Sequence, residues 1–362
     1  MQTPSASFKP HNRFVVLDVL RGVAAFSVML YHFRTVSPHF LTYVAVDFFL
    51  ILSGFILTHA YFRKGEVSFV DFVLTRAARL YPLHLVTLLV SGLLVLIAGK
   101  YFDRSDFVLH LLMIHNIGFG PDGFAFNAPS WSISVEFWTN AIMAGLFVLF
   151  TAQFAAQRVR IWILLAITVA SYTVLAVSVG HLNAHYQNIQ PFVNAGLIRA
   201  MGGFALGMLV YDLCLIADKT MTASQRSAIG ACTPILIGAF CASLFIPLKD
   251  TGLDFLLIPF FAIVVAVAAF EIGPAADHLK HLQWLGTISF ALYLVHHPVL
   301  EFYYFALPAD TPFLVRFCLV IPTALILAQL AHSHIEMPVY RVLKRLIAQR
   351  RTPSLGKARS AG

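Results

Sequence analysis

Long apolar runs dominate the chain and recur from residue 15 to residue 335. A run of about 20 apolar residues is long enough for a helix to cross the hydrocarbon core of a bilayer. The runs of this length are 15–33, 43–62, 80–99, 133–152, 160–180, 192–217, 228–247, 253–270, 284–305 and 313–335. A further run at 107–117 is too short to span and predicts a re-entrant or interfacial helix. The pattern therefore predicts an all-α protein, a polytopic membrane helix bundle of about ten transmembrane helices.

Basic residues between these runs predict how the bundle is oriented. With the N-terminus inside the cell, 18 lysine and arginine residues fall in inside segments and 4 in outside segments. Cytoplasmic loops carry such an excess. We therefore expect a multi-pass protein of the cell inner (cytoplasmic) membrane with both termini cytoplasmic. Its parts would be an N-terminal segment 1–14, a transmembrane domain 15–340, and a basic tail 341–362 that forms an interfacial helix with a disordered end.

Composition agrees with this class. The chain is 59% hydrophobic and 12% charged, whereas soluble proteins carry about 25% charged residues. The net charge of +8 reflects basic cytoplasmic loops, so we expect membrane lipid and not nucleic acid as a partner. The 4 cysteines show no metal-ligand spacing and fall in or beside apolar stretches, so neither a disulfide framework nor a metal site is expected.

The first apolar run, LDVLRGVAAFSVMLYHF, carries ionisable groups at both ends. Asp18 and Arg21 lie near its inner end, and His32 lies near its outer end. Arg or Asp inside a span costs about 2.5–3.5 kcal/mol by insertion scales, so such residues usually mark a site or a pathway. As a helix, the stretch from Arg21 to His32 rises about 16 Å, so the two groups occupy opposite depths of the membrane.

Two acidic residues are predicted at roughly the depth of His32. Glu136 lies less than two turns inside the run 133–152, and Asp47 lies near the outer end of the run 43–62. A carboxylate beside an imidazole orients it and raises its basicity, so either acid is a candidate partner of His32. Either residue could instead be an interfacial acid that caps its own helix. Asp47 could also pair with a nearby cation. In the same second run, the small residues of the SGF segment 53–55 predict close helix packing.

A pair of arginines lies on the predicted cytoplasmic side. Arg76 and Arg79 are three residues apart and therefore share one face of a helix, which Pro82 then bends into the third span. Two guanidinium groups on one face can hold a phosphate. The same pair also fits ordinary anchoring against anionic lipid.

Histidines recur in the last two runs. His296 and His297 precede Pro298 in the outer half of the ninth run, and one of them could line a chamber with His32. The alternative is a buried, hydrogen-bonded histidine at a proline kink. His332 and Glu336 are four residues apart at the inner interface, where a structural bridge between them is expected.

Six stretches together resemble one protein family. They are LDVLRGVAAFSVMLYH (17–32), VDFFLILSGFIL (46–57), TRAARLYPLH (75–84), SWSISVEFW (130–138), LGTISFALYLVHHPV (285–299) and IEMP (335–338). In this order they resemble the integral-membrane acyltransferase 3 family, the bacterial O-acyltransferases of cell-surface glycans.

The resemblance implies roles for matching residues. His32 corresponds to the family's catalytic histidine, Arg76 and Arg79 to its paired arginines for the acyl-CoA phosphates, and Glu136 to the acid of its SxSVE motif. One departure is that many members continue SVEEQFY, whereas this chain has SVEFWTN and so lacks the second acid. Many relatives also carry a fused extracytoplasmic SGNH domain after the last span. This sequence has none there, so we expect transfer to the final acceptor to occur here or through a separate extracytoplasmic acyltransferase partner.

These residues predict acyl transfer across the membrane. Acyl-CoA, with acetyl-CoA as the family's usual donor, would bind from the cytoplasm with its phosphates on Arg76, Arg79 and Arg21. His32, oriented by Glu136 or Asp47, would activate a hydroxyl of an extracytoplasmic glycan or lipid-linked sugar. The alternative is a membrane transporter or flippase in which the His, Glu and Arg residues form a proton relay. A third possibility is a structural membrane component, which would tolerate neutral replacements at His32 and Glu136.

Overall fold

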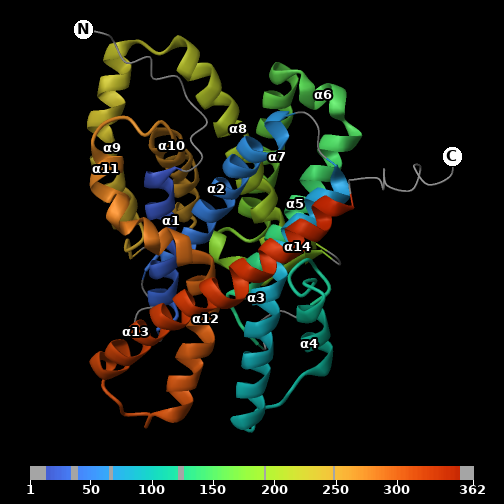
Figure 1. Ribbon diagram of the computed structural model, residues 1–362, viewed down its shortest axis with the longest axis vertical. Helices are drawn as coiled ribbons and strands as arrows, with labels where there is room; N and C mark the ends of the chain where they lie inside the picture. Colours follow the sequence, from blue (N-terminus) through green and yellow to red (C-terminus); the bar gives the residue numbers. More distant parts are fainter. Residues whose placement is uncertain are drawn as a thin grey trace, which may run out of the picture.

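The computed structural model describes residues 14–33, 40–64, 68–120, 126–190, 193–247 and 249–350, and this part of the chain is almost entirely helical (Figure 1). The α-helices are α1 (Val15–Tyr31), α2 (Ala45–Ala60), α3 (Phe69–Ile97), α4 (Arg104–Leu111), α5 (Ser130–Leu149), α6 (Thr151–Ala155), α7 (Gln157–Ser178), α8 (Ala195–Thr220), α9 (Ala223–Ser243), α10 (Leu257–Ala269), α11 (Ala275–Leu279), α12 (Gln283–Ala306), α13 (Phe313–Ala331) and α14 (Met337–Gln349). Short 3₁₀ segments cover Thr42–Val44, Phe62–Lys64, Leu182–Ala184, Leu253–Leu256 and Lys280–Leu282, and a π-helical turn, His332–Glu336, joins α13 to α14. Strands β1 (Asn188–Gln190) and β2 (Val193–Asn194) form one small antiparallel pair.

The all-α membrane class predicted from the apolar runs is confirmed. Within the described ranges, 7 helical stretches are long and apolar enough to cross a membrane: Thr42–Ala60, Phe69–Ile97, Ser130–Leu149, Gln157–Ser178, Ala195–Thr220, Ala223–Ser243 and Phe313–Gln349. Each of the predicted runs overlaps a helix, but α1 has only 17 residues and α10 only 13. A total of about ten spans therefore stays a prediction, as does the cytoplasmic position of the termini.

The short run and the two terminal segments predicted from the sequence compare with the described helices as follows. The short run 107–117 overlaps α4, which has 8 residues and is indeed too short to span. The helical part of the predicted tail is present in α14, whereas its predicted disordered end, 351–362, lies outside the described residues. The predicted N-terminal segment lies outside them up to residue 13.

The start of the third span differs from the prediction. The predicted span begins at residue 80, whereas α3 runs for 29 residues from Phe69 and contains Pro82. The Ser68 side chain caps its first turn by accepting a hydrogen bond from the Asp71 backbone N–H at 3.4 Å. Proline lacks an N–H donor, but membrane bundles tolerate this because neighbouring groups satisfy the freed carbonyls. Arg76 and Arg79 consequently lie on the same continuous helix as the membrane span.

Close helix pairs form the centre of the bundle. α1 packs along α12, and α2 packs along α8, although these partners are far apart in the sequence (Figure 1). Glycines allow both contacts: a Cβ on Gly286 would lie 2.0 Å from the Asp18 carbonyl oxygen, and one on Gly54 would lie 2.1 Å from the Phe204 carbonyl oxygen. The close packing predicted for the segment 53–55 is therefore confirmed, and small residues are the usual means of such packing in membranes.

We expect Gly207→Val to destabilise the bundle strongly. A Cβ at this position of α8 would lie 1.9 Å from the Ile51 carbonyl oxygen, which is backbone and cannot move away without separating α2 from α8. Overpacking of a core costs about 1–3 kcal/mol, and more where backbone must shift. Thermal unfolding of the detergent-solubilised protein measures the effect. Gly238→Val is the matched control, because a Cβ there meets nothing within 4 Å; equal melting temperatures for the two variants would contradict the prediction.

The two ends of the bundle differ in what they carry. In Figure 1 the C-terminal ends of α3 and α12 extend to the bottom together with α4, and we call this the α4 end. α1 begins and α3 begins toward the opposite end, which the basic residues predict to be cytoplasmic. A residue near the start of α1, such as Arg21, and a residue after its last turn, such as His32, therefore face different ends of the molecule.

Candidate active site

The three arginines singled out in the sequence line one cavity. Arg21 of α1 and Arg76 and Arg79 of α3 surround a space of about 180 Å³ that α2, α5 and α12 complete. Glu136 of α5 lines the same cavity. The structure thus brings together the four ionisable residues that the sequence placed on three separate helices.

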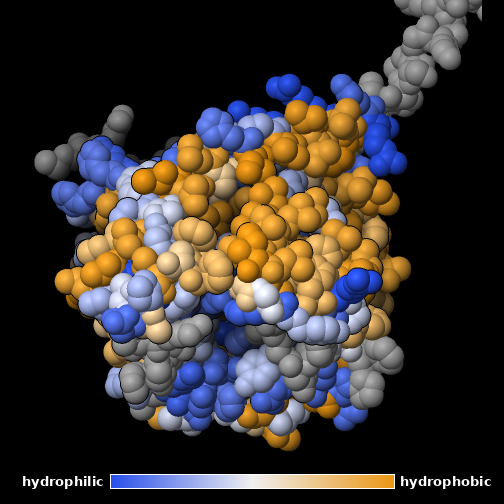
Figure 2. All heavy atoms as spheres, turned by 90° about the horizontal axis from the view of Figure 1, so that it is seen from below, coloured by the Kyte–Doolittle hydropathy of each residue, from blue (hydrophilic) through white to orange (hydrophobic). Residues whose placement is uncertain are grey.

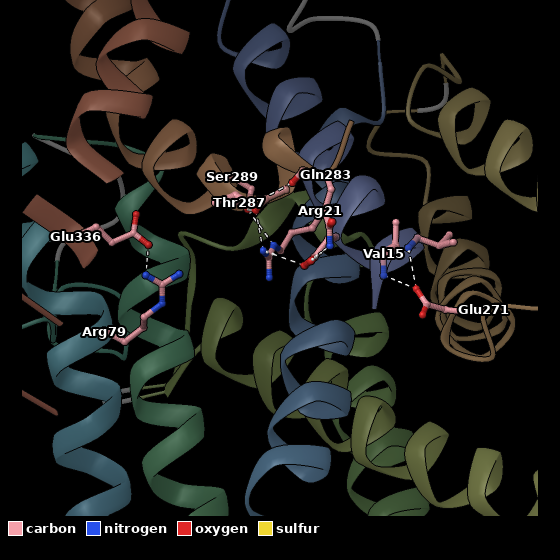
Figure 3. A network of polar contacts seen from close by, with 11 residues as sticks. Val15, Arg21, Arg79, Glu271, Gln283, Thr287, Ser289 and Glu336 are labelled. Atoms are coloured by element: carbon pink, nitrogen blue, oxygen red, sulfur yellow. Dashed lines mark hydrogen bonds and ion pairs between the residues drawn. The ribbon is translucent and has the colours of Figure 1, made fainter. Parts of the chain in front are cut away.

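Arg21 is held against α12. Its Nε donates a hydrogen bond to Ser289 Oγ at 2.9 Å, and its Nη2 donates to the Gly286 carbonyl oxygen at 2.7 Å (Figure 3). Asp18, one turn earlier on α1, lies 3.2 Å from the same guanidinium and accepts a further hydrogen bond from Gln283. With a third of its side chain exposed, the Arg21 guanidinium is fixed in position yet accessible to a ligand in the cavity.

Arg76 pairs with Glu136 across the cavity. Their Nη2 and Oε1 atoms lie 2.7 Å apart, and Ser53 Oγ donates a second hydrogen bond to the same carboxylate oxygen at 3.1 Å. Both charged side chains are largely buried, with 15% and 21% exposed. A carboxylate inside an apolar bundle gains more from a cation than from a neutral ring.

Arg79 connects α3 to the π-helical turn. It forms an ion pair with Glu336, whose other oxygen lies 3.0 Å from His332 Nδ1 (Figure 3). The predicted bridge between His332 and Glu336 is therefore confirmed, and Arg79 is a third member that the sequence did not reveal. The guanidinium also lies 5.2 Å from the centre of the Phe290 ring, within cation–π range.

His32 lies at the other end of α1 and contacts a second histidine. Its Nδ1 is 2.8 Å from the Val28 carbonyl oxygen and 3.2 Å from His296 Nε2, while His296 Nδ1 is 2.9 Å from the Leu292 carbonyl oxygen. Carbonyl oxygens only accept, so in the neutral rings both Nδ1 atoms donate. The single Nδ1–H of His32 is then shared between the Val28 carbonyl oxygen and His296 Nε2, and His32 Nε2 retains the lone pair that a general base needs.

The expected partners of His32 are found elsewhere. Among the described residues, the hydrogen bonds of Glu136 go to Arg76 and Ser53, and the structure brings His296 to His32 in its place. The buried, hydrogen-bonded histidine expected on α12 is found in His296, which also adjoins His32. A chamber shared with His32 stays a prediction. The depth predicted for Glu136 is wrong, because this residue lines the cavity of Arg21 at the opposite end of α1 from His32.

Asp47 forms a buried ion pair with Arg199 of α8. The guanidinium donates from Nε to Oδ1 at 2.8 Å and from Nη2 to Oδ2 at 2.5 Å, and it also donates to the carbonyl oxygens of Leu182 and Tyr43. Both side chains are at most 1% exposed. The sequence had allowed a nearby cation for Asp47 but missed Arg199. The sequence did contain a signal, because Arg199 lies within an apolar run, and an arginine inside a span needs an acidic partner.

We expect Asp47→Ala to destabilise the folded protein strongly, and not to impair the chemical step directly. Removing one partner of a buried ion pair leaves an uncompensated charge and costs about 3–5 kcal/mol. The double variant Asp47→Leu with Arg199→Met should recover much of the stability and retain acyl transfer per folded molecule. Melting temperature and specific activity of both variants measure this, and a stable but inactive double variant would instead assign Asp47 to the chemistry.

Tyr293 links the arginine cavity to the histidines. It lines the cavity, its hydroxyl accepts a hydrogen bond from Ser132 Oγ at 2.8 Å, and its ring centre lies 6.1 Å from that of His296. Tyr293 and His296 are three residues apart on α12 and so lie on one helix face. The sequence reasoning did not single out Tyr293. The route from Arg21 to His32 therefore follows the contact between α1 and α12.

The described residues include no group of three or more His, Cys, Asp or Glu side chains arranged to hold a metal ion. The ionisable residues at the two ends of α1 are instead engaged with one another and with backbone oxygens. Such an arrangement offers cations for an anionic ligand at one end and a base at the other.

Comparison with known proteins agrees with this geometry. The profile of the acyltransferase domain of the acyltransferase 3 family matches residues 14–332, which include the cavity arginines and both histidines. The protein is therefore a membrane-bound acyltransferase, an enzyme that transfers acyl groups other than aminoacyl groups. It belongs to the acyltransferase 3 family, and the resemblance found in the sequence is confirmed.

Three relatives illustrate the range of the family. A candidate membrane-bound transacylase, BcsY of Komagataeibacter xylinus, is 29% identical over 80% of this chain and 74% of its own length. The acyltransferase MdmB of Streptomyces mycarofaciens is 25% identical over 83% of this chain and 82% of its own. The peptidoglycan O-acetyltransferase OatA of Listeria monocytogenes is 24% identical over 89% of this chain but only 55% of its own. No solved structure matches the chain.

Proposed function

We propose that this enzyme transfers an acyl group, acetyl in the usual case, from cytoplasmic acyl-CoA to a hydroxyl of an extracytoplasmic glycan or lipid-linked sugar. The observation that carries the proposal is the division of labour along α1: Arg21 shares a cavity with Arg76 and Arg79, and His32 pairs with His296 at the other end. The Listeria relative OatA is named a peptidoglycan O-acetyltransferase, which supports a glycan acceptor and an acetyl group.

The arginine cavity suits the anionic part of the donor. Coenzyme A carries phosphates, and guanidinium groups bind phosphate oxygens by paired, charge-assisted hydrogen bonds. In the protein without donor, each arginine is held by a carboxylate: Asp18, Glu136 or Glu336. These contacts orient the three cations before the donor arrives, and the phosphates then add contacts to preorganised groups.

The transfer step places His32 as general base. His32 Nε2 takes the proton of the acceptor hydroxyl while the oxygen attacks the thioester carbonyl carbon. A new C–O bond forms, the C–S bond breaks, and the coenzyme A thiolate leaves and is protonated by the imidazolium. His296 acts as a positioning residue, because its Nε2 accepts from His32 Nδ1 and holds the imidazole in the tautomer that exposes Nε2.

The protein lies in the cell inner membrane with both termini in the cytoplasm. In this orientation the arginine cavity lies toward the cytoplasmic donor, and His32 lies toward the extracytoplasmic face. This orientation follows from the excess of basic residues in the inside segments. The acceptor then reaches His32 from the extracytoplasmic side. It is either the final glycan or a separate extracytoplasmic partner that passes the acyl group on to that glycan.

The test reconstitutes the purified protein in vesicles with labelled acetyl-CoA on the face of the arginine cavity and a panel of glycans on the other. We expect free coenzyme A on the donor side and label on the glycan. A transporter or flippase would move solute or ions without releasing coenzyme A, and that result would overturn the proposal.

A further inference from the structure

A second cavity lies at the α4 end of the molecule. It has a volume of about 540 Å³ and lies between the C-terminal halves of α3 and α12 and the segment that leads into α5. None of its lining residues lines the arginine cavity. Its size falls within the range of about 300–1,000 Å³ typical of small-molecule sites. Figure 2 views the molecule from this end, where hydrophilic atoms surround a hollow beside a hydrophobic half.

This outer cavity adjoins the histidines. His297 lines it, and the centre of the His297 ring lies 5.3 Å from that of His32. A ligand in the cavity would therefore contact a ring that itself contacts the base. The arginine cavity approaches the histidines from the other side, through Tyr293. His32 accordingly lies between two cavities, one for each reactant of a transfer.

Polar groups in the outer cavity suit an uncharged sugar. Lys100 Nζ and Glu301 Oε2 lie 3.6 Å apart on its wall, so one cation and one anion offset each other. Ser91 also lines it, and its hydroxyl is buried without a hydrogen-bond partner among the described residues. Buried polar atoms without partners are uncommon and point to a missing ligand or water. Two phenylalanine rings, Phe126 and Phe305, add apolar surface for the C–H face of a sugar.

We propose that this outer cavity is the acceptor subsite and that it takes an uncharged sugar residue. Lys100 and Glu301 bind neighbouring hydroxyls, and Ser91 binds a further one, so that another hydroxyl faces His32 past His297. An acidic sugar is disfavoured because Lys100 already pairs with Glu301, and no second lysine or arginine among the described residues lines this cavity to balance another carboxylate. This inference rests on the proposed function, because a subsite for an acceptor requires a transfer reaction.

The test compares methyl β-glucoside with methyl β-glucuronide as acceptors in the vesicle assay. The two probes share a ring and differ at C6, where the glucoside has a CH2OH group and the glucuronide a carboxylate; because the glucuronide also lacks that hydroxyl, the change caused by Glu301→Gln carries the test. For the wild type we expect a kcat/KM that favours the glucoside roughly 10-fold or more. Glu301→Gln removes the anion but keeps the shape, so the preference should move toward the glucuronide. The KM for acetyl-CoA is measured alongside and should stay unchanged, because Glu301 does not line the arginine cavity.

Asp310→Asn is the matched control. Asp310 is exposed in the connection between α12 and α13 at the same end, and it does not line the cavity. It removes the same charge and should leave the sugar preference unchanged. Melting temperatures should agree for the three proteins, since exposed ion pairs such as that of Lys100 contribute little to stability.

The outcomes separate the two proposals. If the wild type acylates sugars but Glu301→Gln keeps the wild-type preference, or alters it no more than Asp310→Asn, the subsite is wrong and the function stands. If Glu301→Gln chiefly raises the KM for acetyl-CoA, the outer cavity belongs to the donor and the inference is also wrong. If the wild type releases no coenzyme A with any acceptor, the proposed function fails, and the subsite fails with it.

Discussion

Replacing His32 with alanine should abolish acyl transfer while leaving the protein folded in the membrane. The side chain supplies the lone pair that deprotonates the acceptor, and general-base catalysis contributes about 10²–10⁴-fold to a rate. Its hydrogen bonds go to the Val28 carbonyl oxygen and to His296, so its loss breaks no ion pair. The rate of label transfer from acetyl-CoA to glycan, per folded molecule, measures the effect.

Two further variants define what His32 does. His278→Ala, an exposed histidine on α11, is the control and should retain the wild-type rate. His296→Ala should lower kcat without changing the KM for acetyl-CoA, and His296→Asn, which restores an acceptor, should recover part of the rate. Full activity of His32→Ala would remove the general-base role. An unchanged kcat in His296→Ala would remove the positioning role alone.

Replacing Arg76 and Arg79 together with glutamine should weaken acyl-CoA binding by at least about 100-fold. Hydrogen bonds to charged groups contribute about 1.5–3 kcal/mol each, and the double variant loses both guanidinium groups of α3 from the cavity. The affinity for a non-hydrolysable acyl-CoA analogue, measured by calorimetry, reports the loss directly. The melting temperature is measured alongside, because Glu136 and Glu336 lose their cations.

The control distinguishes phosphate binding from lipid anchoring. Arg158 and Arg345 are exposed arginines on the predicted cytoplasmic side, and replacing both with glutamine removes the same net charge. Equal affinities in the two double variants would return Arg76 and Arg79 to the anchoring role. Lysine at both cavity positions keeps the charges for Glu136 and Glu336, and it should give an intermediate affinity because lysine lacks the guanidinium fork.

Sequence reasoning succeeded where a property depends on one helix. The apolar runs predicted the bundle because span length is set by bilayer thickness. The spacing of Arg76 and Arg79 predicted their shared face, and both line the cavity. The same local logic predicted the bridge between His332 and Glu336.

Sequence reasoning failed where partners come from distant helices. Glu136 was predicted at the depth of His32, but the packing of α3 on α5 brings it to Arg76 in the cavity of Arg21, at the other end of α1. Arg199 meets Asp47 because glycines let α8 approach α2 closely, and no local pattern reveals that contact. A sequence orders residues along each helix axis, but the rotation and neighbours of a helix are decided by the packing of the whole bundle.

The carboxylates that hold the cavity arginines affect how readily inorganic ions cross the membrane through the protein. An inorganic anion that enters from the cytoplasm must displace Glu136 or Glu336 from an arginine, and it brings no further groups to compensate for that displacement. A donor with several phosphates and a long apolar arm can make up the difference. The idle enzyme is thus expected to conduct no chloride or phosphate current, even though it holds a cluster of cations within the bilayer.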